Sequence, residues 1–380
     1  MSCSSRRCAL RRRISKENSS VGYQRFDPSA PRSIMSRWTP PKVKEITIHV
    51  LLVMATFITC MMAGAQWVGV NPLEIANWSA GFSYAVLTMT FLLAHEYGHY
   101  LAAYKHQLPS SLPYVIPVPP TIMPFGTFGA VIRTRTPMMT KNQLFDIGVS
   151  GPIAGFVVCI AILMVGFLTL PGPEHLYAIH PEILVNGFSD KGLTFGDTLL
   201  FSFFRWVFDG IVFVPPMNEI YHYPFLCVGW FGLFVTALNL LPFGQLDGGH
   251  VLYALIGKRQ HTVGRILWWI MFALALLWLV GLVHTLLSVD FNPAEFSPWV
   301  LWLRSTVDPT LGEVISQAPW LFSLGEVWTF WLIMVRLFIK IEHPVIADES
   351  PLSTRRKLVG WLAIIILILS IAPKSIYQVP

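Results

Sequence analysis

The chain has 380 residues, of which 54% are hydrophobic and only 13% are charged, against about a quarter charged in an average globular protein. With a mean hydropathy of +0.56, this composition excludes a disordered scaffold, a coiled coil and a disulfide-rich secreted domain. It predicts an all-α polytopic membrane protein. The formal net charge of +6 does not indicate nucleic-acid binding, because residues 1–44 carry a net +9, which leaves −3 for the remainder.

We expect residues 1–44 to form a basic, disordered tail, followed by a membrane-embedded domain over residues 45–380. The tail holds no apolar run long enough for a signal peptide, but its start is rich in Arg and Ser and poor in acids, which is typical of an organellar transit peptide. Two other interpretations stay open. The tail could lie on anionic lipid in the cytoplasm, or the start codon could be placed upstream of Met35.

Apolar runs follow along the chain and predict six to seven transmembrane helices. Five are long enough, or nearly long enough, to span a bilayer: Ile46–Val68, Phe82–Tyr104, Phe145–Leu170, Phe225–Leu241 and Ile266–Leu287. Two further runs are shorter and could pair as a helical hairpin: Val327–Ile341 and Leu358–Ala372.

The segments between these runs differ in charge. Pro171–Tyr223 and Ser288–Gly325 are acidic, whereas the segments on the alternate side carry groups of Lys and Arg. The positive-inside rule then predicts a cytoplasmic N-terminus, seven crossings and a C-terminus on the opposite side.

The apolar segment Leu112–Ile132 carries five prolines and two glycines, so it cannot be a continuous spanning helix. Irregular backbone is tolerated at membrane depth only where protein buries it or a wet cavity faces it. We therefore expect an extended, re-entrant loop beside a cavity. A surface loop among the lipid headgroups is the alternative.

The second apolar run contains the sequence HEYGH, residues 95–99. His95 and His99 are four residues apart and project from the same face of a helix, so both imidazoles can bind one Zn²⁺. Glu96 lies next to that ion and can accept a proton from water. With 11 His and 21 acidic residues, such a pattern is expected about 0.02 times by chance.

A zinc site needs a third protein ligand. Asp247 follows the fourth apolar run, at the same membrane depth as His99 on the cytoplasmic side. Pro242 and Gly244 end the preceding helix, so Asp247 can turn inward and can also cap the next helix. His250 is a rival ligand, although a supporting or packing role suits it better.

HEYGH, together with NLLPFGQLDGGH at residues 239–250, resembles the site-2 protease family of intramembrane zinc metalloproteases. The resemblance implies that His95, His99 and Asp247 bind one zinc ion per chain and that Glu96 is the catalytic base. It also implies that Asn239 contacts the substrate or the developing oxyanion. An interhelical hydrogen bond explains Asn239 equally well.

The resemblance covers roughly residues 80–260, and we expect the catalytic core at about residues 80–262. Within it, PFGTFGAVI at residues 124–132 is similar to the re-entrant β-loop that engages an extended substrate, which would involve Gly126, Phe128 and Gly129. FDIGVSGPIAG at residues 145–155 resembles the Gly-rich third helix of the family.

Three glycines of that third helix form a small-residue stripe, for which close bundle packing is an equal explanation: Gly148, Gly151 and Gly155. Many members of the family carry a PDZ domain or a nucleotide-binding CBS tail. Pro171–Tyr223 is too short for a PDZ fold and no folded module is expected after the last span, so we expect a minimal form.

These features predict a hydrolase, a zinc metalloendopeptidase that cleaves a peptide bond of a membrane-spanning substrate in regulated intramembrane proteolysis. The expected partners are a transmembrane protein and the lipid bilayer, with no nucleic acid, and the oligomeric state stays open. The alternatives are a metal-binding transporter or sensor without peptidase activity and a non-proteolytic scaffold. We expect a bacterial plasma membrane as the location, with a chloroplast membrane as the alternative.

Overall fold

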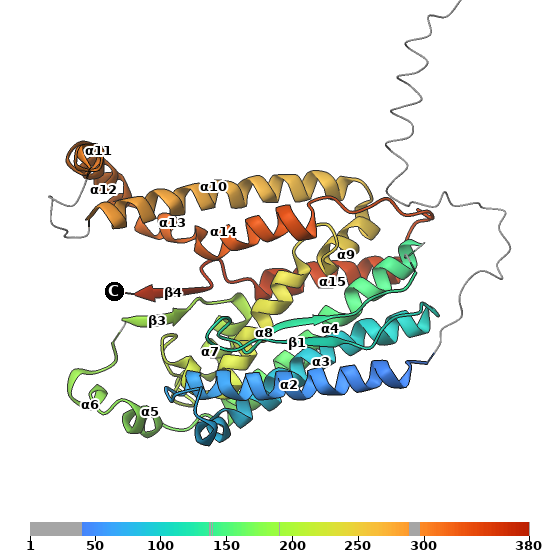
Figure 1. Cartoon of the computed structure of the whole chain (residues 1–380), viewed down its shortest axis with the longest axis horizontal. Coiled ribbons are helices and arrows are strands. Elements are labelled where there is room, and N and C mark those ends of the chain that lie inside the picture. Colours follow the sequence, from blue (N-terminus) through green and yellow to red (C-terminus); the bar gives the residue numbers. More distant parts are fainter. Residues whose placement is uncertain (1–39, 137, 139, 190, 289–296, 380) are drawn as a thin grey trace, which may run out of the picture. The chain divides into compact units, whose positions relative to one another are not determined.

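The computed structural model describes residues 40–136, 138, 140–189, 191–288 and 297–379, so most of the predicted basic tail lies outside the described residues (Figure 1). The longer helices are α2 (Val43–Trp67), α3 (Phe82–Lys105), α4 (Lys141–Leu168), α8 (Pro224–Leu240), α10 (Arg259–Ser288), α14 (Gly325–Met334) and α15 (Thr354–Ser370). The shorter helices are α5 (Glu174–Ile179), α6 (Ile183–Asn186), α7 (Leu199–Phe208), α9 (Asp247–Ile256), α11 (Pro298–Trp302), α12 (Asp308–Gln317) and α13 (Pro319–Ser323). Two antiparallel sheets of two strands each join β1 (Tyr114–Pro117) to β2 (Thr127–Val131) and β3 (Gly192–Phe195) to β4 (Ile376–Val379).

The predicted helical membrane architecture is confirmed at the level of the longest helices. Among the described residues, four segments are long and apolar enough to cross a membrane: Val43–Trp67, Lys141–Leu168, Arg259–Ser288 and Pro319–Ile339. Three other predicted spans differ from these four. Helix α3 has 24 residues but carries the polar HEYGH, and α8 and α15 have 17 residues each.

Helices α3, α4 and α8 form the centre of the fold, with α3 against α4 and α4 against α8. Helix α4 begins at a capping box, because Thr140 Oγ1 accepts from the Gln143 N–H at 3.2 Å and the Gln143 side chain accepts from the Thr140 N–H at 3.3 Å. Proline at the first position of α8 is compatible with a helix start, since that N–H has no helical partner. The core between these helices is largely aromatic, and Phe91 and Trp230 are fully buried.

The two shorter apolar runs near the C-terminus do not form the hairpin considered above. Helix α14 lies along α10, whereas α15 lies along α8 and α4 (Figure 1). The segment of residues 340–353 that joins them crosses the LDG turn, where the Gly244 N–H donates to the Ile341 carbonyl at 3.1 Å. That connection carries α15 away from α14.

The proline-rich segment is extended, as expected, and folds into the hairpin β1–β2 with Tyr114 opposite Val131. The ladder is irregular between Val115 and Pro117. Thr59 of α2 fixes the turn by donating from Oγ1 to the Gly126 carbonyl at 2.6 Å. This hairpin therefore lies on the membrane helix α2.

The acidic segment Pro171–Tyr223 contains α5, α6, β3 and α7. Its strand β3 pairs with β4 near the C-terminus, with Gly192 opposite Val379 (Figure 1). The Trp230 indole donates to the Gly196 carbonyl at 2.7 Å, which holds this segment against the first turns of α8. The acidic segment and the C-terminus are consequently at the same end of α8.

Candidate metal centre

Three predicted ligands, which lie on two separate helices, come together in the structure. The His95 and His99 Nε2 atoms are 3.1 Å apart, and Asp247 Oδ2 lies 3.3 Å from the first and 3.2 Å from the second. Only 4% of the His95 side chain and 17% of the Asp247 side chain are exposed. Three donors converge here on one small, buried space.

This triangle fits a tetrahedral zinc ion. Ligands that each bind Zn²⁺ at about 2.0–2.1 Å lie about 3.3 Å apart at the corners of a tetrahedron. The protonation of His99 also fits, because its Nδ1–H donates to the Ile147 carbonyl at 2.7 Å and so leaves the Nε2 lone pair for a metal. Two imidazoles and one carboxylate leave a fourth position for water or substrate.

Asp247 reaches the histidines because α8 ends early and the chain turns back. The helix ends at Leu240, and α9 begins at Asp247 itself. A Cβ on Gly248 would lie 1.9 Å from the Leu240 carbonyl oxygen, so only glycine allows this close return. The expectation that Asp247 also caps α9 is wrong: Leu246 is the N-cap residue, and the Asp247 carboxylate is directed at the two imidazoles instead.

The two predicted catalytic residues flank the same space. Glu96 is 8% exposed on α3, and its carboxyl lies in the electrostatic field of all three donors. The Asn239 amide Nδ2, near the end of α8, lies 3.5 Å from His95 Nε2. The structure thus brings Glu96 and Asn239 together with the metal-binding triangle.

The glycine stripe on α4 has a more specific use than helix packing. A Cβ on Gly151 would lie 2.1 Å from His99 Nε2, and one on Gly155 would lie 3.2 Å from His95 Nδ1. A Cβ on Gly148 would lie 2.8 Å from the Cβ of His250. Gly151 and Gly155 therefore make room for the two imidazoles of the metal centre, and Gly148 makes room for His250.

His250 does not belong to the triangle and binds a residue that the sequence analysis did not identify. Its Nδ1 lies 2.8 Å from Nε2 of His343, and the His343 ring stacks on Tyr253 with centroids 4.5 Å apart. Gln260 joins the same network by donating to the Pro242 and Ile341 carbonyls at 2.8 and 3.1 Å. We call residues 340–343 the strap. It fixes the turn that carries Asp247.

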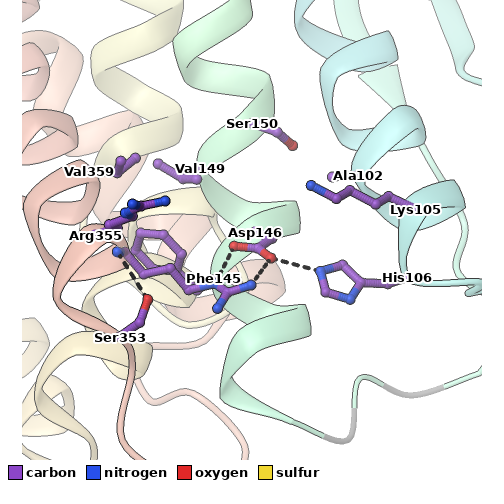
Figure 2. A pocket seen from close by; sticks show the side chains of 11 residues that line it. Ala102, Lys105, His106, Phe145, Asp146, Val149, Ser150, Ser353, Arg355 and Val359 are labelled. Atoms are coloured by element: carbon purple, nitrogen blue, oxygen red, sulfur yellow. Dashed lines mark hydrogen bonds and ion pairs between the residues drawn. The ribbon is translucent and has the colours of Figure 1, made fainter.

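A cavity of about 530 Å³ lies between the last turn of α3 and the first turns of α4 and α15 (Figure 2). The Asp146 carboxylate lies 2.8 Å from His106 Nε2 and 2.8 Å from the guanidinium nitrogens of Arg356. Figure 2 shows Asp146 facing His106 in this cavity. Ser150 also lines the cavity, and its hydroxyl donates at 3.0 Å to the Ile147 carbonyl, the same carbonyl that orients His99. The network ties α15 to the helices that hold the metal centre.

The three predicted substrate-binding residues lie on the turn and on β2, apart from the triangle. Gly126 and Gly129 have φ of +78° and +87°, which glycine adopts without strain. The Phe128 side chain is 55% exposed. An exposed strand residue between two glycines leaves β2 accessible from outside.

Comparison with known proteins agrees with this geometry. The model of Peptidase family M50 matches residues 83–278, more than half of the chain and the part that contains the triangle. The chain belongs to this family. Peptidase family M50 holds the site-2 proteases, so the family expected from HEYGH and the LDG motif is confirmed.

The curated relatives are plant proteins. The chain is 34% identical over 245 residues to "Probable zinc metalloprotease EGY1, chloroplastic" of Oryza sativa subsp. japonica, an alignment that covers 63% of this chain and 37% of the relative. The Arabidopsis thaliana protein of the same name is 30% identical, with 63% and 39% covered. "Probable zinc metalloprotease EGY2, chloroplastic" of Oryza sativa subsp. indica is 25% identical, with 71% and 44% covered.

The chain spans less than half the length of these relatives. No solved structure matches it. All three relatives are named as zinc metalloproteases.

Proposed function

We propose that this M50 protein is an intramembrane zinc metalloprotease that cleaves a peptide bond of a membrane-spanning protein. The observation that carries the proposal is the triangle of His95, His99 and Asp247, with Glu96 buried beside it. Membership of a peptidase family and relatives named as zinc metalloproteases support the same activity.

His95, His99 and Asp247 would hold the zinc ion, which when bound acidifies water and polarises a carbonyl group. Glu96 accepts the proton of the attacking water and passes it to the leaving amine of the cleaved bond. The Asn239 amide donates a hydrogen bond to the oxygen on which negative charge develops. The Ile147 carbonyl keeps the proton of His99 on Nδ1 throughout.

We infer from the hairpin β1–β2 how the substrate binds. A helical substrate hides its carbonyl groups in its own hydrogen bonds, so the segment to be cleaved must be extended first. Strand β2 offers an edge for such a segment, and the exposed Phe128 offers it an apolar side chain. We therefore assign Gly126, Phe128 and Gly129 to substrate binding, in a loop that re-enters the membrane.

We propose that the chain crosses the membrane seven times, with the N-terminus in the cytoplasm or its organellar equivalent. The pairing of β3 with β4 supports the count, because α8, α10, α14 and α15 lie between these strands and four crossings return the chain to the same side. The relatives are named chloroplastic, which favours the chloroplast membrane over the bacterial plasma membrane.

The proposal is tested with Glu96→Gln, which keeps the size of the side chain but removes the base. Removal of a general base costs about 10²–10⁴-fold in rate. We expect that loss in the cleavage of a co-expressed transmembrane substrate, with zinc content unchanged. Glu313→Gln, at an exposed glutamate of α12, is the matched control and retains full activity. Undiminished cleavage by Glu96→Gln would refute the mechanism.

A further inference from the structure

A second cluster of metal-binding side chains lies in the acidic segment, outside the site described above. It consists of His180, which follows α5, and of Glu219 and His222, which directly precede α8. The two His Nε2 atoms are 3.1 Å apart, and Glu219 Oε2 lies 3.8 Å from the first and 3.5 Å from the second. The distance from His222 to Asn239 along the helix is about 25 Å, so the clusters are separate.

Both imidazoles direct Nε2 into the cluster. His180 is oriented from behind, because its Nδ1 lies 3.0 Å from a carboxylate oxygen of Glu182. A carboxylate on the far nitrogen is the usual partner of a metal-bound histidine, since it fixes the ring and makes the near nitrogen a stronger donor. The His222 side chain is 4% exposed, so its ring is held by burial.

Two buried polar atoms of this cluster lack a partner. Within the part of the chain that the structure describes, neither Glu219 Oε2 nor His222 Nδ1 has a hydrogen-bond partner. A buried carboxylate oxygen without a hydrogen bond is costly, and a cation between the three donors would remove that cost.

We propose that His180, Glu219 and His222 bind a second divalent transition-metal ion, for which Zn²⁺ suits the two imidazoles and one carboxylate. The ion joins the segment of α5 and α6 to the start of α8, so its role is structural. Neutral imidazole and carboxylate bind the cation directly, without a redox step or a covalent change. The proposal does not depend on the peptidase activity.

The experiment measures zinc per chain by mass spectrometry on the purified full chain, after equilibration with Zn²⁺ and gel filtration into metal-free buffer. We expect two ions in the wild type, one in Asp247→Ala, one in His222→Ala and none in the double variant. Glu219→Gln, which changes shape very little, also holds one ion. His284→Ala is the matched control: it removes an imidazole paired with Asp308 at 2.7 Å and retains two ions.

A second readout is the thermal unfolding temperature of the chain with and without zinc. Zinc added to metal-free protein raises the thermal unfolding temperature of Asp247→Ala, which keeps only the second site, and leaves that of the double variant unchanged. A wild type with one ion that Asp247→Ala removes would overturn the second site alone. Two ions retained in both His222→Ala and Glu219→Gln would also overturn it. A wild type with a single ion that is lost in His222→Ala and kept in Asp247→Ala would instead contradict the proposed active site.

Discussion

The two metal-binding clusters share their donors, two imidazoles and one carboxylate, but differ in how the chain holds them. In the first, the donor atoms lie 3.1, 3.2 and 3.3 Å apart, and two of them come from successive turns of α3. In the second, the distances are 3.1, 3.5 and 3.8 Å, and the donors come from segments outside the long helices. Helices thus hold the first triangle close to tetrahedral spacing, whereas the second must contract around its ion.

The surroundings differ as well. The first cluster has Glu96 and Asn239 beside the donors, which are the groups that proton transfer and oxyanion stabilisation require. In the second, Glu219 is itself a donor and Glu182 orients His180. The same ligand set therefore suits catalysis at one end of α8 and structural support at the other.

The largest expected effect is a loss of cleavage activity when a ligand of the first cluster is removed, without such a loss at the second cluster. Asp247→Ala removes a ligand of the catalytic ion, and we expect cleavage of a co-expressed transmembrane substrate to fall by about 10³-fold or more. His222→Ala removes a ligand of the other ion and should change the rate by less than about 3-fold at a temperature where the chain is folded. Equal losses in the two variants would contradict the division of roles.

Asn239→Ala sharpens the contrast within the first cluster. The loss of one oxyanion donor costs about 10²–10³-fold in kcat, and we expect that loss with both zinc ions retained. Single-turnover cleavage together with metal content measures it. If the variant loses only thermal stability and keeps its kcat, then Asn239 forms an interhelical hydrogen bond and nothing more.

Gly151→Ala tests whether the glycine stripe serves the metal. The new Cβ would lie 2.1 Å from His99 Nε2, so the imidazole must move. We expect zinc affinity at the first cluster to fall by about 10–100-fold, while the second cluster keeps its ion. Val157→Ala, at a residue of the same helix that is 59% exposed, is the control and should bind zinc as the wild type does. Normal zinc affinity in Gly151→Ala would assign the stripe to packing alone.

Glu182→Gln is the corresponding change at the second cluster. Replacing the carboxylate next to His180 Nδ1 by an amide should lower the zinc affinity of the second cluster by about 10–100-fold. The zinc affinity of the first cluster and the cleavage rate should not change. A competition titration with a zinc chelator measures both sites in one experiment. An unchanged affinity would show that Glu182 does not support the ion.

The smallest expected effect concerns the strap, which contacts the turn that carries Asp247. Burial lowers the pKa of His343, whose ring contacts His250 and Tyr253 and whose backbone carbonyl lies 3.0 Å from His261 Nε2. The unfolded chain therefore takes up the proton first, and stability is lost as the pH falls below the ordinary histidine pKa of about 6.5. The unfolding temperature of the wild type should drop between pH 7.5 and 5.5, and less so in His343→Asn. Equal drops in the two proteins would remove His343 as the cause.

Much of this was predictable where the signal is local. Hydropathy located α2, α3, α4 and α10, and the i, i+4 spacing of His95 and His99 predicted a shared face. Asp247 was found because a helix break and an acid at one depth leave few alternatives. Its supposed capping role was wrong because the carboxylate binds the imidazoles instead.

Contacts between distant residues were not predictable. His180 and His222 are 42 residues apart, and Asp146 and Arg356 are 210 apart, without a periodic pattern that links them. The role of Gly151 depends on which side chain faces it across α3 and α4, and that is a property of packing. The strap was missed because His343 lies in a connection whose course over the LDG turn only the fold determines.

The most direct test of the central claim is anomalous diffraction at the zinc absorption edge from crystals of the full chain. We predict an ion bonded at about 2.0–2.2 Å to His95 Nε2, His99 Nε2 and Asp247 Oδ2, beside Glu96. A zinc ion bound elsewhere, with these three side chains bonded to no metal, would contradict the account.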